Sequence, residues 1–575
     1  MVALTGGEAI LKALLPERVT NVFGVTGGKL SPLMAALARE PGIRYVGARH
    51  EGAAALMAAG SAAVAGRIAV AIGECGSGAV NLVPGLAVAN SNSLPFLAIT
   101  SNNQHTVSYP GRGMFAEMDT ESLLRPVTKW NSAIHDGRRI PELVRMAMRE
   151  AHTGRRGAVH LDVPQDVLRS TFEFDDAEFT LEPSNYRLTQ GPAATREQVE
   201  AAVALLVGAE RPLLIAGGGV RLAGASEEFR ALAALLNAAA TATQTGSGAI
   251  ATDDAHFVGH GTVTSGPAYE RARREADVIL VVGCRVSPWV GLGPDMLAKG
   301  ARLIHVTTDA GNLGRNAPIA VGLLADAKLA LGDLLAGVRA RRPAPPGRPW
   351  LATLRETLAA QRRALAAIAA DASAPMHPAA LAEELGRCLP ADALVTYDGG
   401  HTTFWSSDFT PVSTPASRFN EVGMTQLGFG LPFAIAQKLH RPDCRVVNIT
   451  GDGAFGFTLQ ELDTARRYGL PVVTVIHNNA AWGVIRIAHQ RGYGFTLGDD
   501  LDGTDYAAIA RGFGCFGEVV TERGQVRGAL DRAFAAGVPA VLDCRVRFEP
   551  HPSLPEFGRM GAVGLPSQPP TVRRG

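Results

Sequence analysis

The sequence has 575 residues, of which 46% are hydrophobic and 19% charged, and its formal net charge is +1. This length allows about three to four domains, and the near-neutral charge excludes a general attraction to nucleic acid or to a membrane surface. The chain starts without the pattern of a signal peptide, no apolar run reaches the length of a membrane span, and six scattered cysteines favour reduced thiols. We therefore expect a cytoplasmic protein that binds neither nucleic acid nor membranes.

Residues 1–175 alternate helix and strand patterns, which is typical of a doubly wound parallel sheet. One predicted strand runs into Gly27 and Gly28, and the next precedes His50 and Glu51, which open an alanine-rich helix. Taken alone, Glu51 is most simply a carboxylate that interacts with the helix dipole.

Residues 190–337 form a second predicted α/β domain. One of its strands ends at 217–219 in three glycines, but the third glycine of a dinucleotide-binding fingerprint is absent, so a structural turn is the simpler interpretation. Arg285 follows another strand end. Residues 338–374 are typical of a proline-rich linker followed by an amphipathic helix.

Residues 375–550 form the third predicted α/β domain and carry the most specific pattern of the chain. An apolar strand runs into Asp452, a helix follows, and the next strand ends at Asn479, 27 residues further on. Because the carboxyl ends of neighbouring parallel strands meet at one edge, these two side chains should lie close together. A carboxylate and an amide oxygen suit Mg²⁺, and a glycine turn that enters a helix suits a phosphate. The alternative is an ordinary turn with Asp452 as a helix cap.

The segment from Gly451 to Gly483 resembles the cofactor motif of thiamine diphosphate-dependent enzymes of the acetolactate synthase and pyruvate decarboxylase type. The resemblance implies three doubly wound parallel-sheet domains (pyrimidine-binding, central and diphosphate-binding), followed by a tail over 551–575. It also implies a homodimer or homotetramer with active sites between subunits. The implied Mg²⁺ ligands are Asp452, the Asn479 side chain and the Ala481 backbone carbonyl.

The segment RHE at 49–51 looks like a second signature of this family, whose glutamate hydrogen-bonds the aminopyrimidine ring. The resemblance therefore implies a catalytic role for Glu51. His50 is either an acid–base group that faces the substrate or a packed side chain. The implied cofactor-binding residues are Gly27, Gly28, Gly400, His401, Thr402, Leu427, Gly451, Asp452, Gly453, Ala454, Asn479, Ala481, Trp482 and Gly483. Leu427 falls where the family places a bulky apolar residue between the two cofactor rings; by propensity alone it would be a core residue.

Three features point to a particular member of the family. Ala116 stands where acetolactate synthases carry glutamine, and segment 283–289 looks like part of 2-hydroxyacyl-CoA lyases and oxalyl-CoA decarboxylases. The tail is either a lid over the active site or disordered. We therefore expect a lyase that cleaves a 2-hydroxyacyl-CoA to an aldehyde or ketone and formyl-CoA. The candidate substrate-contacting residues are Phe115, Ala116, Arg285, His477, Trp482 and Phe557.

Two alternatives stay open. One is an acetolactate synthase-like carboligase or 2-oxoacid decarboxylase, and the other is a non-catalytic cofactor-binding subunit. The expected cofactors are thiamine diphosphate and Mg²⁺. The central domain is a candidate site for ADP or CoA, FAD is not expected, and the expected partner is a small acyl-CoA substrate.

Overall fold

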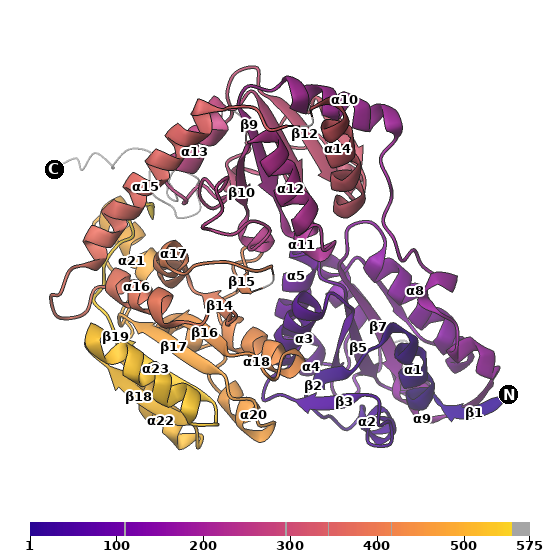
Figure 1. Cartoon of the computed structure of the whole chain (residues 1–575). Coiled ribbons are helices and arrows are strands. Elements are labelled where there is room, and N and C mark those ends of the chain that lie inside the picture. Colours follow the sequence, from indigo (N-terminus) through magenta and orange to yellow (C-terminus); the bar gives the residue numbers. More distant parts are fainter. Residues whose placement is uncertain (109–110, 294–295, 343, 416, 555–575) are drawn as a thin grey trace, which may run out of the picture. The chain divides into compact units, whose positions relative to one another are not determined.

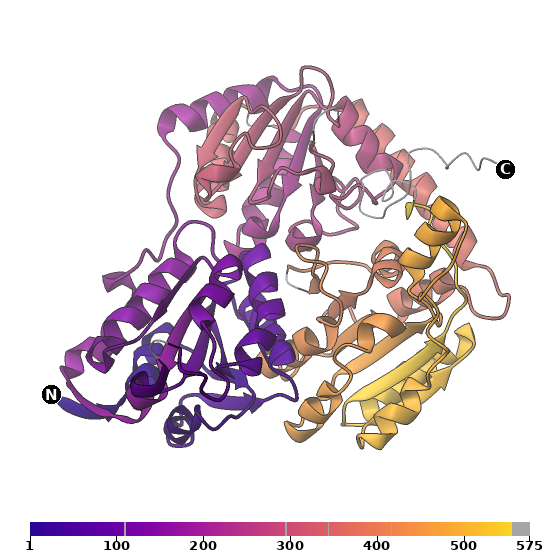
Figure 2. The same cartoon turned by 180° about the vertical axis from the view of Figure 1, so that it is seen from behind.

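The computed structural model describes residues 1–108, 111–293, 296–342, 344–415 and 417–554. Helices and strands alternate along the chain and build three parallel β-sheets, each accompanied by helices (Figure 1, Figure 2). The predicted fold, with three α/β domains that each contain a parallel sheet, is therefore confirmed. Within the described residues, every helix is too short or too polar to span a bilayer.

The first sheet lies in the N-terminal part of the chain and has the order β3-β2-β4-β5-β7-β6, with every pair parallel. Its strands are β2 (Asn21–Gly24), β3 (Arg44–Gly47), β4 (Ala69–Glu74), β5 (Phe96–Asn102), β6 (Trp130–Ala133) and β7 (Ala158–Pro164). A separate antiparallel pair joins β1 (Val2–Thr5) and β8 (Thr171–Phe174). The helices of this region are α1 (Gly6–Leu14), α2 (Ser31–Leu37), α3 (Glu51–Ala65), α4 (Ser77–Asn81), α5 (Val83–Ser91), α6 (His105–Ser108), α7 (Thr120–Leu124), α8 (Ile140–His152) and α9 (Gln165–Arg169).

The second sheet has five parallel strands in the order β10-β9-β11-β12-β13. They are β9 (Pro212–Ala216), β10 (Ala239–Ala242), β11 (Val278–Val282), β12 (Arg302–Thr307) and β13 (Val321–Leu324). The helices are α10 (Arg196–Gly208), α11 (Gly218–Leu222), α12 (Ser226–Leu236), α13 (Pro267–Glu275), α14 (Ala327–Arg341) and, towards the last sheet, α15 (Pro349–Ala369).

The third sheet has six parallel strands in the order β15-β14-β16-β17-β19-β18. They are β14 (Leu394–Asp398), β15 (Arg418–Asn420), β16 (Val446–Gly451), β17 (Val473–Asn478), β18 (Phe516–Val520) and β19 (Ala540–Arg545). The helices in this part of the sequence are α16 (Pro378–Cys388), α17 (Gly400–Phe409), α18 (Gly430–His440), α19 (Asp452–Phe455), α20 (Glu461–Arg467), α21 (Gly483–Ala488), α22 (Tyr506–Gly512) and α23 (Val526–Ala535).

The register of the third sheet positions the candidate site. Asp398 pairs with Thr450, and Gly451 pairs with His477, so β14, β16 and β17 end side by side. The strands are apolar because helices cover them, and residues such as Val447 and Val475 are fully buried. Polar residues that follow these strands therefore gather at one edge.

The chain packs as two compact units. The first contains 1–190, 421–443 and 458–470, and the second contains 191–420, 444–457 and the chain from 471 on. Helices α18 and α20 thus belong with the N-terminal sheet, and α18 lies along α3. The domain boundaries expected from the sequence remain predictions, because packing divides the chain in a different way from sequence order.

Candidate active site

Asp452 begins α19 directly after β16, and its side chain is buried. Its Oδ1 accepts a hydrogen bond from the Gly453 amide (2.9 Å), whereas Oδ2 has no hydrogen-bond partner among the described residues. Burial raises the pKa of Asp452 to about 6, and hydrogen bonds from backbone amides, including those of Ala480 and Ala481, oppose this shift. A buried oxygen without a partner is costly, and a cation bound here would satisfy it.

The loop after β17 meets Asp452 at the same edge of the sheet. Asn479 Oδ1 accepts a hydrogen bond from the Ala481 amide (3.1 Å), and Ala480 adopts a left-handed conformation with φ of 53°. No three His, Cys, Asp or Glu side chains cluster as metal ligands anywhere in the described part of the chain. The ligands that the sequence predicts at this edge are one carboxylate, one amide oxygen and one backbone carbonyl, a set that suits Mg²⁺ completed by phosphate and water.

Two buried histidines without hydrogen-bond partners lie at this edge. Both ring nitrogens of His401, near the start of α17, and of His477, in β17, lack a partner among the described residues. Burial lowers the pKa of each to about 3, with His551 adding a smaller effect at His401, so both rings are neutral at pH 7. Buried polar atoms are rarely left unpaired. These nitrogens are therefore candidates to hydrogen-bond a ligand or ordered water.

Glycines bring the predicted cofactor residues close together. A Cβ at Gly453 would lie 2.5 Å from the Trp482 ring, so only glycine admits the indole at that distance. A Cβ at Gly451 would lie 3.2 Å from Thr402 Oγ1. The structure thus brings most of the predicted cofactor residues to one edge of the third sheet: Gly400, His401, Thr402, Gly451, Asp452, Gly453, Ala454, Asn479, Ala481, Trp482 and Gly483.

Substitution of Gly483 tests this packing. A Cβ there would lie 2.6 Å from His401 Nδ1 and 3.3 Å from Asn479 Nδ2, so Gly483→Ala should displace both side chains. The resemblance implies thiamine diphosphate with Mg²⁺ as the ligand, and we expect its Kd, measured by calorimetry, to rise about 10- to 100-fold, as for other disturbed metal-ligand surroundings. Gly512→Ala is the control, because a Cβ at Gly512 meets no atom within 4 Å. Equal Kd values for the two variants would contradict this packing.

Glu51 is the first residue of α3, in the other unit. Its Oε2 accepts a hydrogen bond from Asn81 Nδ2 (3.0 Å), and Oε1 lies 3.3 Å from the position of a Cβ at Gly78. His50 is the N-cap of α3, since its Nδ1 accepts the Gly52 amide (3.0 Å). This contact leaves Nε2 as the protonated nitrogen of a neutral His50. Asn81, the last residue of α4, was not predicted as a site residue.

A lysine missed by sequence reasoning links the loops around Gly27 and Phe115. The Lys29 amide donates to Glu74 Oε1 (3.0 Å), and its ammonium donates to the Phe115 carbonyl (3.1 Å) and lies 5.0 Å from the centre of that ring. A Cβ at Gly27 would lie 2.0 Å from Glu74 Oε2. Phe115 is 82% exposed, and Ala116 adopts a left-handed conformation with φ of 56°. Because Lys29 holds this loop in place while the Phe115 ring stays exposed, the ring is suited to contact a ligand.

The remaining predicted residues are less informative. Leu427 is half-buried, while Gly28 and Arg285 are exposed. Phe557 lies outside the described residues, as does nearly all of the tail for which a lid and a disordered segment were the two predictions.

The glycine turn of the central domain packs against backbone. A Cβ at Gly217 would lie 2.3 Å from the Gly283 carbonyl oxygen, and one at Gly219 would lie 2.6 Å from Gly283 Cα. These contacts explain the glycines by close packing, in agreement with the structural-turn interpretation. The proposed ADP or CoA site remains a prediction.

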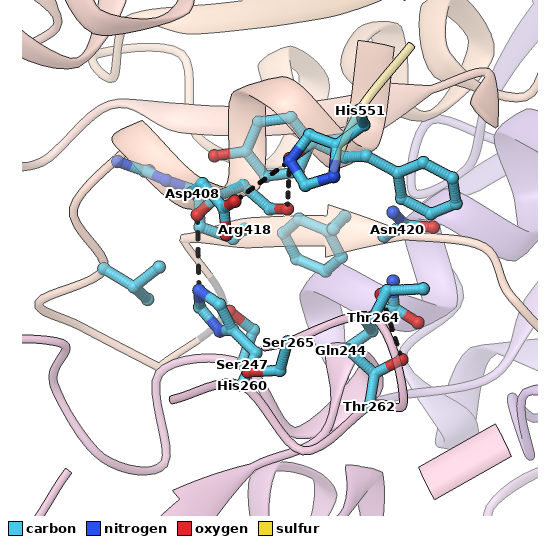
Figure 3. Close-up of a pocket in the computed structure, with 15 residues that line it drawn as sticks. Gln244, Ser247, His260, Thr262, Thr264, Ser265, Asp408, Arg418, Asn420 and His551 are labelled. Atoms are coloured by element: carbon cyan, nitrogen blue, oxygen red, sulfur yellow. Dashed lines mark hydrogen bonds and ion pairs between the residues drawn. The ribbon is translucent and has the colours of Figure 1, made fainter. Parts of the chain in front are cut away.

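The second unit also contains a pocket of about 40 Å³ between loops after β10 and the α17–β15 region (Figure 3). Figure 3 shows the His551 ring directed at Asp408, where Nε2 and Oδ2 are 3.1 Å apart. On the opposite wall, His260 Nε2 donates to the Ser407 carbonyl (3.2 Å). Such a volume holds a few water molecules and is far below the several hundred Å³ typical of organic-ligand sites.

Comparison with known proteins places this geometry in a family. Residues 4–123 match the N-terminal TPP binding domain of thiamine pyrophosphate enzymes, 199–334 match their central domain, and 398–544 match their C-terminal TPP binding domain. The chain belongs to the family of thiamine pyrophosphate (thiamine diphosphate) enzymes. The residues at the third-sheet edge fit this cofactor and its metal, because a buried unpaired carboxylate oxygen, unpaired imidazoles and a glycine turn meet there.

The chain is similar to several acetolactate synthases over nearly its whole length. It is 31% identical to the probable acetolactate synthase large subunit of Methanococcus aeolicus over 94% of this chain and 92% of the relative. It is 31% identical to the probable acetolactate synthase large subunit of Methanocaldococcus jannaschii over 98% of this chain and 95% of the relative. It is also 31% identical to the acetolactate synthase isozyme 2 large subunit of Escherichia coli over 94% of this chain and 95% of the relative.

Proposed function

We propose that this protein is a thiamine diphosphate-dependent carboligase of the acetolactate synthase type. In such a reaction one 2-oxoacid, for example pyruvate, loses CO₂, and its remaining acyl unit is joined to the carbonyl carbon of a second 2-oxoacid. The observation that carries this proposal is the 31% identity to acetolactate synthase large subunits over more than nine-tenths of the chain.

The expected 2-hydroxyacyl-CoA lyase is now the weaker candidate. None of the reported relatives is named as a lyase or as acting on a CoA thioester. Of the three features that suggested it, the tail lies mostly outside the described residues, Arg285 is exposed, and only Ala116 still argues against a plain acetolactate synthase.

We also propose that Asp452 Oδ2, the Asn479 side chain and the Ala481 carbonyl hold Mg²⁺, with the cofactor's diphosphate completing its ligand set. The neutral His401 ring and the Thr402 hydroxyl would donate hydrogen bonds to the diphosphate. Trp482 packs on Gly453, and its ring is proposed to shield this edge from water. The unpaired Asp452 oxygen supports the proposed metal site.

When bound, thiamine diphosphate supplies an electron sink for the carbon atom that loses CO₂. Glu51 is proposed to exchange a proton with the aminopyrimidine nitrogen. Asn81 holds Oε2 and leaves Oε1 for this contact. The Lys29 and Phe115 pair is proposed to border the 2-oxoacid, with the ammonium placed to donate to an oxygen of the substrate.

The proposal is tested with pyruvate labelled with ¹³C at C1. We expect the pure enzyme with thiamine diphosphate and Mg²⁺ to release labelled CO₂ and to form acetolactate with one CO₂ per product molecule, read by mass spectrometry. Omission of the cofactor should abolish both products. Labelled CO₂ with acetaldehyde and no acetolactate would identify a decarboxylase instead.

A further inference from the structure

The segment that leads into Glu51 is held by the helix after the glycine–aspartate turn of the C-terminal domain. Glu461, the first residue of α20, is completely buried. Both of its carboxylate oxygens lie 3.2 Å from the Arg49 amide nitrogen, and Oε2 also accepts from Thr464 Oγ1 (2.6 Å). Arg49 precedes Glu51 by two residues. All of these residues belong to one compact unit.

Two further contacts fix the same segment at Gly47. The Gly47 amide donates to the Tyr468 hydroxyl (2.6 Å), and the Gly47 carbonyl accepts from Arg467 Nη2 (2.7 Å). The stretch from Gly47, the last residue of β3, to Arg49 is thus held at both ends by α20 and Tyr468. His50 then caps α3, and Glu51 begins it.

A carboxylate in the position of Glu461 needs an explanation. Burial of an acidic group is unfavourable, and burial raises the pKa of Glu461 to about 7, against the hydrogen bonds from Thr464 and Arg49. An apolar residue would leave the Arg49 amide without this acceptor. The position of Glu461 is therefore most simply explained by the segment that it binds.

We propose that Glu461 is a positioning residue that fixes the segment 47–50 and thereby aims the Glu51 carboxylate at the cofactor. Tyr468 assists by holding Gly47. Catalytic groups must be held within a fraction of an ångström, and a displacement of about 1 Å can cost about 100-fold in rate. This inference rests on the role proposed for Glu51 and is independent of the substrate proposed above.

The test compares Glu461→Ala with Glu461→Gln. The glutamine retains an oxygen that can accept the Arg49 amide, and alanine does not. We measure the rate at which the C2 proton of bound thiamine diphosphate exchanges in D₂O, by quenched NMR, together with the Kd of the cofactor and the Tm. We expect Glu461→Ala to slow exchange about 10- to 100-fold at saturating cofactor, with Kd within about threefold, and Glu461→Gln to restore most of the rate.

Exchange at the wild-type rate in saturated Glu461→Ala would overturn the proposal, whatever its Kd or Tm. Exchange in Glu461→Gln as slow as in Glu461→Ala would also overturn it, because the glutamine oxygen that can accept the Arg49 amide would then have no effect on the rate. If Glu461→Ala does not fold, Tyr468→Phe decides, since it removes only the hydroxyl that accepts the Gly47 amide. Slower exchange in Tyr468→Phe at unchanged Kd supports the proposal, and unchanged exchange overturns it. None of these readouts requires turnover of pyruvate, so a failed carboligase assay leaves the test intact.

Discussion

Glu51→Gln is expected to reduce kcat by about 10²- to 10⁴-fold, the range typical for loss of a positioned acid–base group. Glutamine keeps the shape of the side chain and can still accept the hydrogen bond from Asn81 Nδ2. It cannot exchange a proton with the cofactor. The Kd of thiamine diphosphate should therefore change little, and the loss should persist at saturating cofactor and substrate.

The control for this prediction is Glu173→Gln, at an exposed position of β8. It should turn over at the wild-type rate. If Glu51→Gln kept more than a tenth of the wild-type kcat, the acid–base role of Glu51 would be wrong. If its loss were reversed by more cofactor, Glu51 would serve binding rather than proton transfer.

Asp452→Asn is expected to raise the Kd of thiamine diphosphate in the presence of Mg²⁺ by about 100-fold or more, since even second-layer partners of metal ligands contribute 10- to 100-fold. The Tm of the cofactor-free protein should rise or stay unchanged. Burial disfavours the charged form of Asp452, and one of its oxygens has no partner. A neutral amide in its place removes part of that cost.

A raised Kd together with a Tm that does not fall separates a metal-binding role of Asp452 from a structural one. A residue that merely supports the fold would lower the Tm of the cofactor-free protein when it is replaced. Calorimetric titration and thermal unfolding of the same samples measure both quantities, with the exposed Asp531→Asn as the control. An unchanged Kd for Asp452→Asn would rule out Asp452 as a metal ligand in the proposed site.

The parallel sheets and much of the third-sheet edge were predictable because their signals are local. Apolar strands followed by glycine and a polar residue predict strand ends, and parallel topology brings those ends together. The approach of Asp452 to the loop around Asn479 follows from these two facts. The family was recognisable for the same reason, because the local motifs at 49–51 and 451–483 lie within the ranges that match its domains.

The partners of Glu51 were not predictable in the same way. Asn81 binds the Glu51 carboxylate itself, and Glu461 binds the Arg49 amide two residues before it, although Glu461 and Arg49 are 412 residues apart in the chain. No helical or strand period encodes such a contact. The packing of α20 with the N-terminal sheet was also missed, because chain order assigns this helix to the last domain.

The substrate class expected from the sequence differs from the one that the relatives' names support. Ala116 and segment 283–289 favoured an acyl-CoA substrate, but each is one short pattern, whereas the relatives match over nearly the whole chain. Local motifs of this kind carry little weight against similarity of that extent, and only an assay separates the two substrate classes.

A competition experiment tests whether this enzyme acts on 2-oxoacids or on acyl-CoA thioesters. The pure enzyme with thiamine diphosphate and Mg²⁺ is given equal concentrations of pyruvate and a panel of 2-hydroxyacyl-CoA thioesters, and all products are followed by mass. We expect acetolactate and CO₂ from pyruvate, with the thioesters unconsumed. Formyl-CoA and an aldehyde or ketone from the thioesters, with pyruvate untouched, would contradict this expectation and establish the lyase instead.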